Sequence, residues 1–454
     1  MVNGFGSRVD RRSFLGTFGA GAGVLALGGF PVGPPLLRRD QRPNIVYITA
    51  DDLGYGDLSG YGRADYRTPV LDALAAEGTR FTQAYSIAPI CTPTRVGFMT
   101  GRYPARHPVG LREPLTLSPA HRALGLEPAH PTISSLLKHA GYTTALLGKW
   151  HLGVRPEFHP NRHGFDEFFG PLTGAVDYIS HSDVSGAHDL YHNGDRVRAT
   201  GYLTDLLAER AVRFIQQRRE PFFLSHQGTA THAPWQRRHD EPIGTKGVPA
   251  FNVGPGDRFP DMVRALDEAV GRILEALEKT GMANRTLVIF TSDNGGVQHS
   301  SMGGLARQKG HVWEGGIRVP AFARWPDVIP ARVTTTQVAS TLDWTATILA
   351  AAGASPAPTH PPDGIDLLPI LAGRAPEQDR TICWRMSQRT QQGAVRQGRW
   401  KYLRDENGEY LFDLVLDPGE RNDRKSDASE RFSRLKEEYG AWERAMLAPV
   451  PVDH

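Results

Sequence analysis

Short apolar runs alternate along this chain with longer stretches in which apolar residues recur at helical spacing. That alternation is typical of an α/β domain built on a largely parallel sheet. Four of the runs end at or lead into polar clusters, and they occupy residues 44–50, 143–147, 221–225 and 287–292. Because ligands of open α/β sheets bind beyond the carboxyl ends of the strands, we expect these four strands to bring their polar residues to one site.

The helical stretches between these runs have recognisable ends. Those at residues 70–78 and 340–353 finish at a glycine, which readily adopts the left-handed conformation that follows a helix. Further helical stretches are predicted at residues 132–141, 204–217, 260–281 and 363–373. After about residue 375 the pattern changes to short strand candidates, followed by a charged helix at 429–446. The strand candidates are residues 394–395, 400–403 and 410–412.

The expected fold class is α/β, with a large, mainly parallel mixed sheet flanked by helices and a smaller C-terminal α+β domain carrying a short antiparallel sheet. A chain of 454 residues is longer than a single hydrophobic core usually supports. We therefore expect a leader and linker at 1–40, a main domain at 41–375 and a C-terminal subdomain at 376–454.

Charge separates the leader from the rest of the chain. The formal net charge of +3 arises within residues 1–40, which hold five arginines and two aspartates. The remainder is neutral, so we expect no nucleic-acid partner. With 40% hydrophobic and 22% charged residues, the composition is that of an ordinary globular protein.

The leader has the features of an export signal. Arg11 and Arg12 precede a glycine- and alanine-rich apolar stretch at residues 16–30, the arrangement of a twin-arginine (Tat) signal. A random basic N-terminus is the alternative. The glycine content argues against a stable membrane anchor. We expect export by the Tat translocase to the periplasm or outside the cell, with cleavage between residues 26 and 40.

Two pairs of adjacent oxygen-bearing side chains follow two of the strands. Asp51 and Asp52 come after the first run, and Asp293 and Asn294 after the fourth. Taken singly, each pair could cap a helix or form an Asx-turn. Together, at one edge of a sheet, they offer the ligands of a hard divalent cation, and Ca²⁺ accepts looser geometry than Mg²⁺.

The chain has only two cysteines, so they were not placed to form a disulfide framework. A single Cys91–Cys383 disulfide is arithmetically possible. Cys383 lies in an apolar, strand-like setting and is better interpreted as a buried thiol. Cys91 belongs to the pentapeptide Cys91-Thr92-Pro93-Thr94-Arg95, which explains it better than a disulfide does.

That pentapeptide resembles the signature of the type I, formylglycine-dependent sulfatases of the alkaline-phosphatase-like superfamily, written C-x-P-S-R or more loosely C-x-P-x-R. Thr94 replaces the usual serine and keeps its hydroxyl. The metal pairs fit the same family, and three further strings resemble its motifs in the family's order. These strings are Gly148-Lys149-Trp150-His151, Thr231-His232-Ala233-Pro234 and Lys309-Gly310-His311. A lone lysine or histidine in a loop is usually structural or solvated.

The resemblance implies an activity and a set of roles. Cys91 would be oxidised by a formylglycine-generating enzyme to Cα-formylglycine, whose hydrate attacks the sulfur of a sulfate monoester. One Ca²⁺, or less readily Mg²⁺, would be held by Asp51, Asp52, Asp293, Asn294 and modified Cys91. The implied catalytic residues are Cys91, Arg95, Lys149, His151, His232 and Lys309.

The resemblance also divides the chemistry among these residues. His232 or Lys309 protonates the leaving alcohol, and His151 accepts a proton as sulfate is released. Arg95 holds the hydrate or the metal-bound carboxylates. If residues 149–151 are extended, their i, i+2 spacing points Lys149 and His151 to the same side.

Three functions remain open from the sequence. The first is a sulfuric ester hydrolase acting on aryl sulfates or sulfated carbohydrates. The second is a phosphonate or phosphate monoester hydrolase of the same superfamily, and the third is a catalytically silent protein that binds sulfated sugars. Asp177 and His181 could contact a sugar hydroxyl, or could be loop residues satisfied by backbone groups.

Overall fold

An 11-stranded sheet runs through the computed structural model, which describes residues 42–219, 221–243, 254–388 and 390–450. Its strand order is β10-β2-β9-β8-β1-β7-β3-β4-β5-β6, with β11 beside β2. The strands are β1 (Asn44–Ala50), β2 (Thr79–Tyr85), β3 (Thr143–Gly148), β4 (Glu167–Gly170), β5 (Tyr191–His192), β6 (Asp195–Arg196), β7 (Phe222–Gln227), β8 (Thr286–Ser292), β9 (Arg318–Arg324), β10 (Val333–Thr335) and β11 (Ala339–Ser340).

The centre of the sheet is parallel. Strands β8, β1, β7, β3 and β4 all run in one direction, whereas β9 is antiparallel to both β8 and β2. The sheet is therefore mixed but mainly parallel, as expected.

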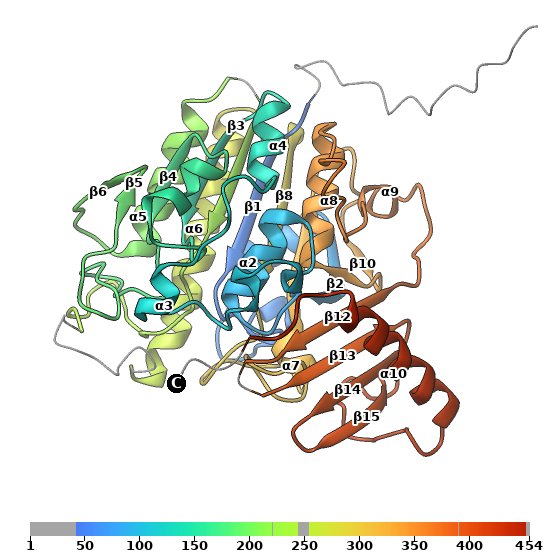
Figure 1. Ribbon diagram of the computed structural model, residues 1–454. Helices are drawn as coiled ribbons and strands as arrows, with labels where there is room; N and C mark the ends of the chain where they lie inside the picture. Colours follow the sequence, from blue (N-terminus) through green and yellow to red (C-terminus); the bar gives the residue numbers. More distant parts are fainter. Residues whose placement is uncertain (1–41, 220, 244–253, 389, 451–454) are drawn as a thin grey trace, which may run out of the picture. The chain divides into compact units, whose positions relative to one another are not determined.

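Helices cover both faces of this sheet (Figure 1). They are α1 (Pro69–Ala76), α2 (Cys91–Thr100), α3 (Pro119–Arg122), α4 (Ile133–His139), α5 (Leu203–Gln216), α6 (Phe259–Lys279), α7 (Glu314–Ile317), α8 (Thr341–Ala352), α9 (Leu368–Leu371) and α10 (Ser429–Arg444). The predicted helix at residues 363–373 is represented only by the short α9. The other predicted helices are confirmed, with ends within a few residues of those expected.

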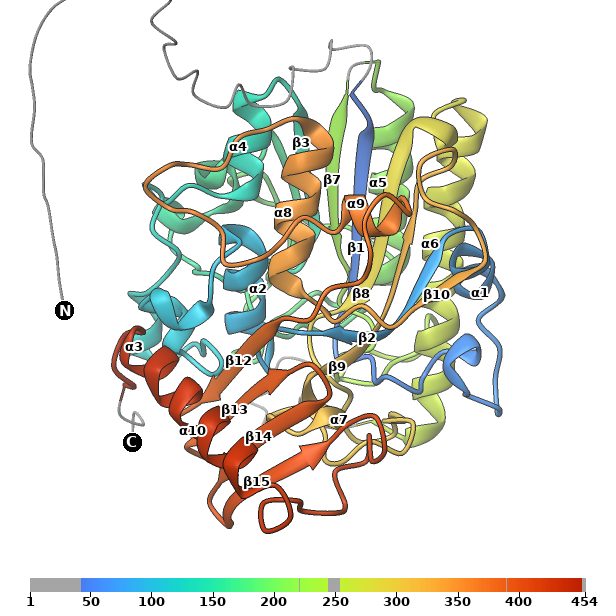
Figure 2. The same ribbon diagram turned by 90° about the vertical axis from the view of Figure 1, so that its right-hand side faces the viewer.

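Alternate residues of β1 supply two separate cores. Val46 and Ile48 pack with side chains of α1, α5 and α6. Ile45 and Tyr47 pack on the other face with side chains of α2, α4 and α8. Figure 2 shows α2, α4 and α8 on one side of the sheet, with α5 and α6 beyond it. A strand buried on both faces is apolar throughout, which is why its sequence is a continuous run.

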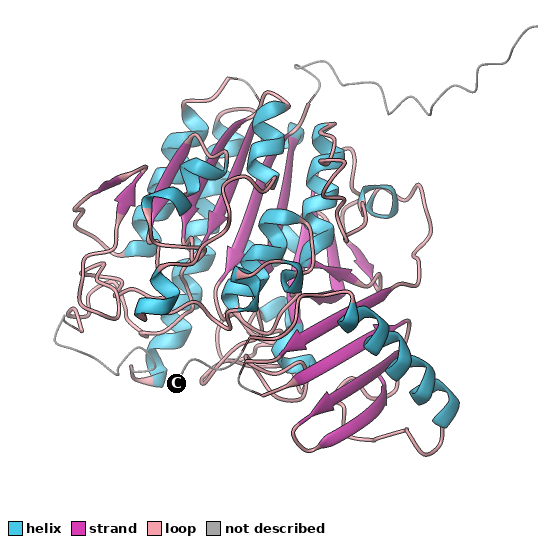
Figure 3. Cartoon of the chain, viewed as in Figure 1, coloured by secondary structure: helices cyan, strands magenta, loops and turns pink. Residues whose placement is uncertain are grey.

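Residues after 380 form a second, antiparallel sheet with α10 lying across it (Figure 3). Its strands, in order, are β12 (Thr381–Met386), β13 (Gln392–Gln397), β14 (Trp400–Asp405) and β15 (Gly408–Asp413). One face packs on Leu435 and Tyr439 of α10. The other shares a core with Tyr85, and Trp384 Nε1 donates to the carbonyl of Ser86 at 2.8 Å.

The expected fold class is thereby confirmed, whereas the domain boundary near residue 375 stays a prediction. The proposed leader at residues 1–40 lies outside the described residues. Among the helices that are described, none has both the length and the apolar character needed to cross a bilayer.

Candidate active site

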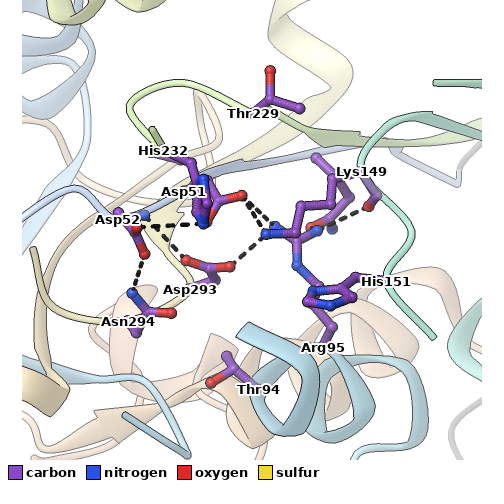
Figure 4. Close-up of polar contacts among 12 residues, drawn as sticks. Asp51, Asp52, Thr94, Arg95, Lys149, His151, Thr229, His232, Asp293 and Asn294 are labelled. Carbon is purple, nitrogen blue, oxygen red and sulfur yellow. Dashed lines mark hydrogen bonds and ion pairs between the residues drawn. The ribbon is translucent and has the colours of Figure 1, made fainter. Parts of the chain in front are cut away.

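The four strands expected to converge are neighbours in the sheet, in the order β8-β1-β7-β3. Their carboxyl ends lie level with one another: Ala50 is opposite Ser292, and Gly148 is opposite Gln227. The segments that follow them carry the predicted polar residues to this edge, where Figure 4 shows them together. The expected convergence on one site is therefore observed.

Cys91 is the first residue of α2, and its side chain is buried. Burial raises the pKa of its thiol. Cys91 lines a cavity of about 220 Å³ together with His151, His232 and Lys309, so four predicted catalytic residues share one space. Cys383 is buried on β12, and both cysteines are free thiols, which excludes the disulfide alternative.

The hydroxyl of Thr94 bonds to the backbone, and Thr94 does not line this cavity. Its hydroxyl donates to the carbonyl oxygens of Ala88 at 2.9 Å and Ile90 at 3.1 Å. Both acceptors belong to the turn that leads into α2. The hydroxyl of the pentapeptide therefore holds the turn that presents Cys91, and serine could make the same bonds.

Arg95 links α2 to the carboxylates beyond the strands. It donates to Asp293 Oδ2 at 3.0 Å and lies 3.6 Å from Asp51 Oδ2. Its other terminal nitrogen donates to the Gln227 side-chain oxygen at 3.1 Å and to the Lys149 carbonyl at 2.9 Å. Of its two expected roles, the geometry supports holding the carboxylates in place.

Two lysines pair with the two adjacent aspartates. Lys149 Nζ donates to Asp51 Oδ2 at 2.7 Å, and both side chains are fully buried. Lys309 Nζ lies 2.6 Å from Asp52 Oδ1 and 2.8 Å from Oδ2. Burial is the largest single influence on Asp52 and opposes its ionisation, but the charges of Lys309 and His232 and the hydrogen bonds from Lys309 and Asn294 together outweigh it and lower the pKa of that carboxyl.

The acidic cluster has the donor set of a cation site. Among the described residues, Asp51 Oδ1 and Asn294 Oδ1 are buried oxygens without a hydrogen-bond partner, which is uncommon unless a bound ion or water completes them. Burial and the nearby Asp51 charge raise the pKa of Asp293 to about 6. A divalent cation would satisfy both oxygens and relieve the repulsion between the Asp51 and Asp293 carboxylates, so the residues fit the implied metal.

The composition of the cluster differs in part from the expected ligand set. Ligand atoms of Asp51, Asp52 and His232 lie within 4.8 Å of one another, so His232 joins the acidic group although the sequence predicted only a catalytic role for it. Asn294 directs its amide nitrogen to Asp52 Oδ1 at 2.7 Å. Asp293 Oδ1 accepts from the backbone N–H of Asp52 at 3.3 Å.

The hydrogen bonds of the two histidines fix their neutral tautomers. His151 Nε2 lies 2.9 Å from the carbonyl of Leu115, which can only accept, so Nε2 carries the proton. His151 Nδ1 is then a buried acceptor that has no partner in the part of the chain that the structure describes. His232 Nδ1 donates to the carbonyl of Ala233 at 2.6 Å, which leaves its Nε2 3.7 Å from Asp52 Oδ2. Burial is the main cause that lowers the pKa of both rings.

Residues 149–151 are not extended, so the condition for Lys149 and His151 to point to the same side is not met. Strand β3 ends at Gly148, and His151 has a φ of 59°, in the left-handed region. Lys149 enters the carboxylate cluster while His151 lines the cavity, so the two side chains serve adjoining spaces. Spacing along a strand could not reveal this turn.

The Asp177 loop is held by its own contacts. Asp177 Oδ1 accepts from the backbone N–H of Ser180 at 2.7 Å, and Oδ2 accepts from Gln236 Nε2 at 3.0 Å. His181 Nε2 lies 3.1 Å from the Gly201 carbonyl. Neither residue lines the cavity next to Cys91. Of the two interpretations of these residues, the contacts favour the structural one.

Gln227 and Gln392 are two site residues that the sequence analysis missed. Gln227, the last residue of β7, contacts Arg95. Gln392, on β13, accepts from the backbone N–H of Val312 and donates to the Gly310 carbonyl, next to Lys309. Their partners are 132 and 80 positions away in sequence, so no local pattern signals either contact.

Known proteins resemble this chain in sequence. The family model described as "Sulfatase" matches residues 43–354, well over half of the chain. Human N-acetylgalactosamine-6-sulfatase is 37% identical over 75% of this chain and 68% of its own length. Bovine arylsulfatase A is 36% identical over 83% of this chain and 77% of its own.

Solved structures resemble it as well. Ps i-CgsB, whose structure was also determined in complex with k-i-k-neocarrahexaose, superposes with a TM-score of 0.80 and 32% identity over 91% of this chain and 95% of that one. The phosphonate monoester hydrolase of Agrobacterium radiobacter, at 21% identity and a TM-score of 0.64, shares the fold. The buried cysteine, the cationic side chains and the carboxylates meet at one edge of the sheet, in agreement with these sequence matches. This chain therefore belongs to the sulfatase family, the alkaline-phosphatase-like hydrolases of sulfate esters.

Proposed function

We propose that this sulfatase uses a Cα-formylglycine made from Cys91, together with one Ca²⁺, to hydrolyse its sulfate ester. The observation that carries the proposal is the position of Cys91. It is the first residue of α2 and lines a cavity together with Lys309, His151 and His232. Arg95, one helical turn further on, reaches the carboxylates beyond the strands.

The cysteine cannot easily act as it stands. Burial raises the pKa of the Cys91 thiol, which disfavours the reactive thiolate. Oxidation to formylglycine would supply a hydrated aldehyde as the nucleophile at this position. A formylglycine-generating enzyme is thus the proposed partner in maturation.

A divalent cation held by Asp51, Asp52, Asp293 and Asn294 would supply positive charge for the sulfate oxygens and the nucleophile. Ca²⁺ suits this all-oxygen set better than Mg²⁺, which demands stricter octahedral geometry.

The chain's own side chains handle the substrate's charge and protons. Lys309 reaches the cavity and would neutralise a sulfate oxygen or protonate the leaving oxygen, with His232 beside it. The Leu115 carbonyl fixes the tautomer of the His151 ring and leaves Nδ1 as an acceptor. That nitrogen would take up a proton as sulfate leaves.

The test is a peptide mass spectrum of the Cys91 segment, from full-length chain produced with a formylglycine-generating enzyme, combined with turnover of 4-nitrophenyl sulfate. We expect an aldehyde at Cys91 and measurable hydrolysis. Cys91→Ala should lower turnover about 10³-fold or more with the fold intact. The matched control is Cys383→Ala, which removes the other cysteine and should retain turnover. An unmodified thiol in an active enzyme would overturn the proposal.

The phosphonate-hydrolase alternative is tested in the same assay, since a phosphonate monoester hydrolase shares this fold. It would be supported if the holoenzyme hydrolysed phenyl phosphonate monoesters faster than 4-nitrophenyl sulfate. Tight binding of sulfated sugars by a chain with an intact thiol and no hydrolysis would favour the silent binding protein.

Export by the Tat translocase to the periplasm or medium remains part of the proposal. It rests on Arg11, Arg12 and the apolar stretch at 16–30. Replacement of both arginines by lysine should leave the enzyme in the cytoplasmic fraction; unchanged export of that variant would refute the route.

A further inference from the structure

The cavity next to Cys91 is lined by two chemically different groups of residues. Cys91, His151, His232 and Lys309 form the group that a sulfate would contact. Carbon-rich side chains make up most of the remainder of the described wall: Leu115, Leu117, Val154, Leu172, Ala175 and Val184. Its polar side chains are those of Thr116, Thr173 and His121. No Asp, Glu, Arg or further Lys is among the described residues of that wall.

The hydroxyl groups of this wall are engaged within the protein. Thr173 donates its hydroxyl to Asp189 Oδ2 at 2.6 Å. The Thr116 hydroxyl lies 2.9 Å from His121 Nδ1, and the same ring nitrogen is 3.0 Å from the Thr116 backbone nitrogen. The proton of each hydroxyl is therefore already used, and neither threonine is positioned to donate it to a substrate.

Several backbone groups of the wall are occupied as well. The N–H groups of Leu172 and Thr173 both donate to the Asp189 carboxylate, at 3.2 and 2.9 Å. The N–H of Leu115 donates to the Thr92 hydroxyl at 3.1 Å, and its carbonyl accepts from His151. Residues 115 and 172–173 therefore present mainly carbon to a bound alcohol.

Buried carboxylates hold segments 114–117 and 172–173 of the wall in place. Asp189 holds residues 172–173, as described above. Glu113 precedes residues 114–117 and accepts from the backbone N–H groups of Ser387 and Gln388, at 3.0 and 2.7 Å. Gln388 returns a bond by accepting from the Glu113 N–H at 2.9 Å. Turning the backbone of the wall toward a ligand would break these bonds.

We propose that the alcohol part of the sulfate ester is a compact apolar group, an aryl or cycloalkyl alcohol, and not a sugar. This rests on the proposed function and specifies its substrate. Sugar hydroxyls placed against this wall would lose water and gain few hydrogen-bond partners in return, which disfavours binding. An apolar ring gains from leaving water. A cavity of about 220 Å³ has room for a single ring, since an engineered apolar cavity of about 150 Å³ holds benzene.

The test compares two esters of matched leaving group. In cyclohexylmethyl sulfate and in galactose 6-sulfate, the sulfate is attached to a CH2 group that is bonded to a six-membered ring. Only the second ester carries hydroxyl groups on the ring. With the aldehyde-bearing holoenzyme, we expect kcat/KM for cyclohexylmethyl sulfate to be at least about tenfold higher, the discrimination typical of an apolar pocket.

Variants of the wall provide the second measurement. Val184→Asn changes a side chain that is 38% exposed at the cavity, so the fold should tolerate it. It should lower kcat/KM for the cycloalkyl ester several-fold and narrow the preference. Val415→Asn is the matched control, an exposed valine outside this cavity, and should leave both rates unchanged.

The outcomes separate the two proposals. Equal or faster hydrolysis of galactose 6-sulfate would overturn the apolar assignment while leaving the sulfatase mechanism intact. An unchanged preference in Val184→Asn would also count against it. If the aldehyde is present but 4-nitrophenyl sulfate and both test esters are left intact, the proposed mechanism fails and the apolar assignment falls with it.

Discussion

Gln392 accepts a hydrogen bond from the backbone N–H of Val312 at 2.9 Å, across 80 positions of sequence. The same side chain donates to the carbonyl of Gly310 at 3.3 Å. These two bonds fix the backbone at Gly310 and Val312, directly after Lys309. The C-terminal sheet therefore helps to position the Lys309 ammonium group in the active site.

Gln392→Ala should lower kcat about 10- to 100-fold, because a small displacement of a catalytic group is costly. KM should change less, since the apolar wall is untouched. The measurement is steady-state kinetics on 4-nitrophenyl sulfate. Gln397→Ala, on the same strand, is the control, and equal losses in both variants would point to general loosening of the sheet.

Asp293→Asn should reduce the bound metal and the activity together. The change keeps the shape of the side chain but removes one of the three buried negative charges at the site. We expect Ca²⁺ content to fall well below that of wild type and turnover to fall about 10²-fold or more. Ca²⁺ should raise the melting temperature of the wild type but much less that of the variant.

Asp363→Asn serves as the control for that experiment, because Asp363 pairs with Arg106 outside the cluster. A full metal complement in Asp293→Asn would remove Asp293 from the ligand set.

Thr94→Ser should mature and turn over like the wild type, because serine can donate to the same carbonyls of Ala88 and Ile90. Thr94→Val should lower the free energy of unfolding by about 1–3 kcal/mol, since buried acceptors lose their donor. Aldehyde yield by mass spectrometry and chemical denaturation measure the two effects. Poor conversion in Thr94→Ser would show that the methyl group itself is needed.

Glu420→Gln should alter how stability depends on pH. Lys401 donates to both Glu314 and Glu420, and all three side chains are buried. Burial raises the pKa of Glu420 from 4.5 to about 7. Between those pH values the folded protein holds a proton that the unfolded chain releases, so the free energy of unfolding falls as pH rises.

The variant lacks this titration. Relative to Glu420→Gln, the wild type should therefore lose stability as pH increases from about 4.5 to about 7. Denaturant titrations at several pH values measure the difference, with exposed Glu430→Gln as the control. A constant difference between wild type and Glu420→Gln across that range would contradict the assignment.

Much of the fold could be predicted because its signals are local. The apolar run of β1 and the capping residues of α8, where Ser340 and Asp343 bond each other's backbone, are visible in short windows of sequence. The convergence of Asp51 and Asp293 followed from one rule about parallel strands. Residues brought to the site by the sheet itself were thus found from sequence.

The missed features depend on contacts that no short window contains. The left-handed turn at His151 and the paired hydrogen bonds of Gln392 arise from packing between distant segments. The apolar wall was missed for the same reason, because Leu115 and Leu172 meet only in the folded chain. Individually, each is an ordinary core residue in sequence.

The reciprocal bonds between Glu113 and Gln388 limit how this enzyme can be trimmed or redesigned. A fragment cut at residue 375 would lose both the anchor of segment 114–117 and the Gln392 bonds beside Lys309. Exchange of the 114–117 segment for that of another sulfatase should carry residues 387–388 with it. For protein engineering, residues 114–117 and residues 387–388 therefore form one structural unit, although Glu113 and Gln388 are 275 positions apart in the chain.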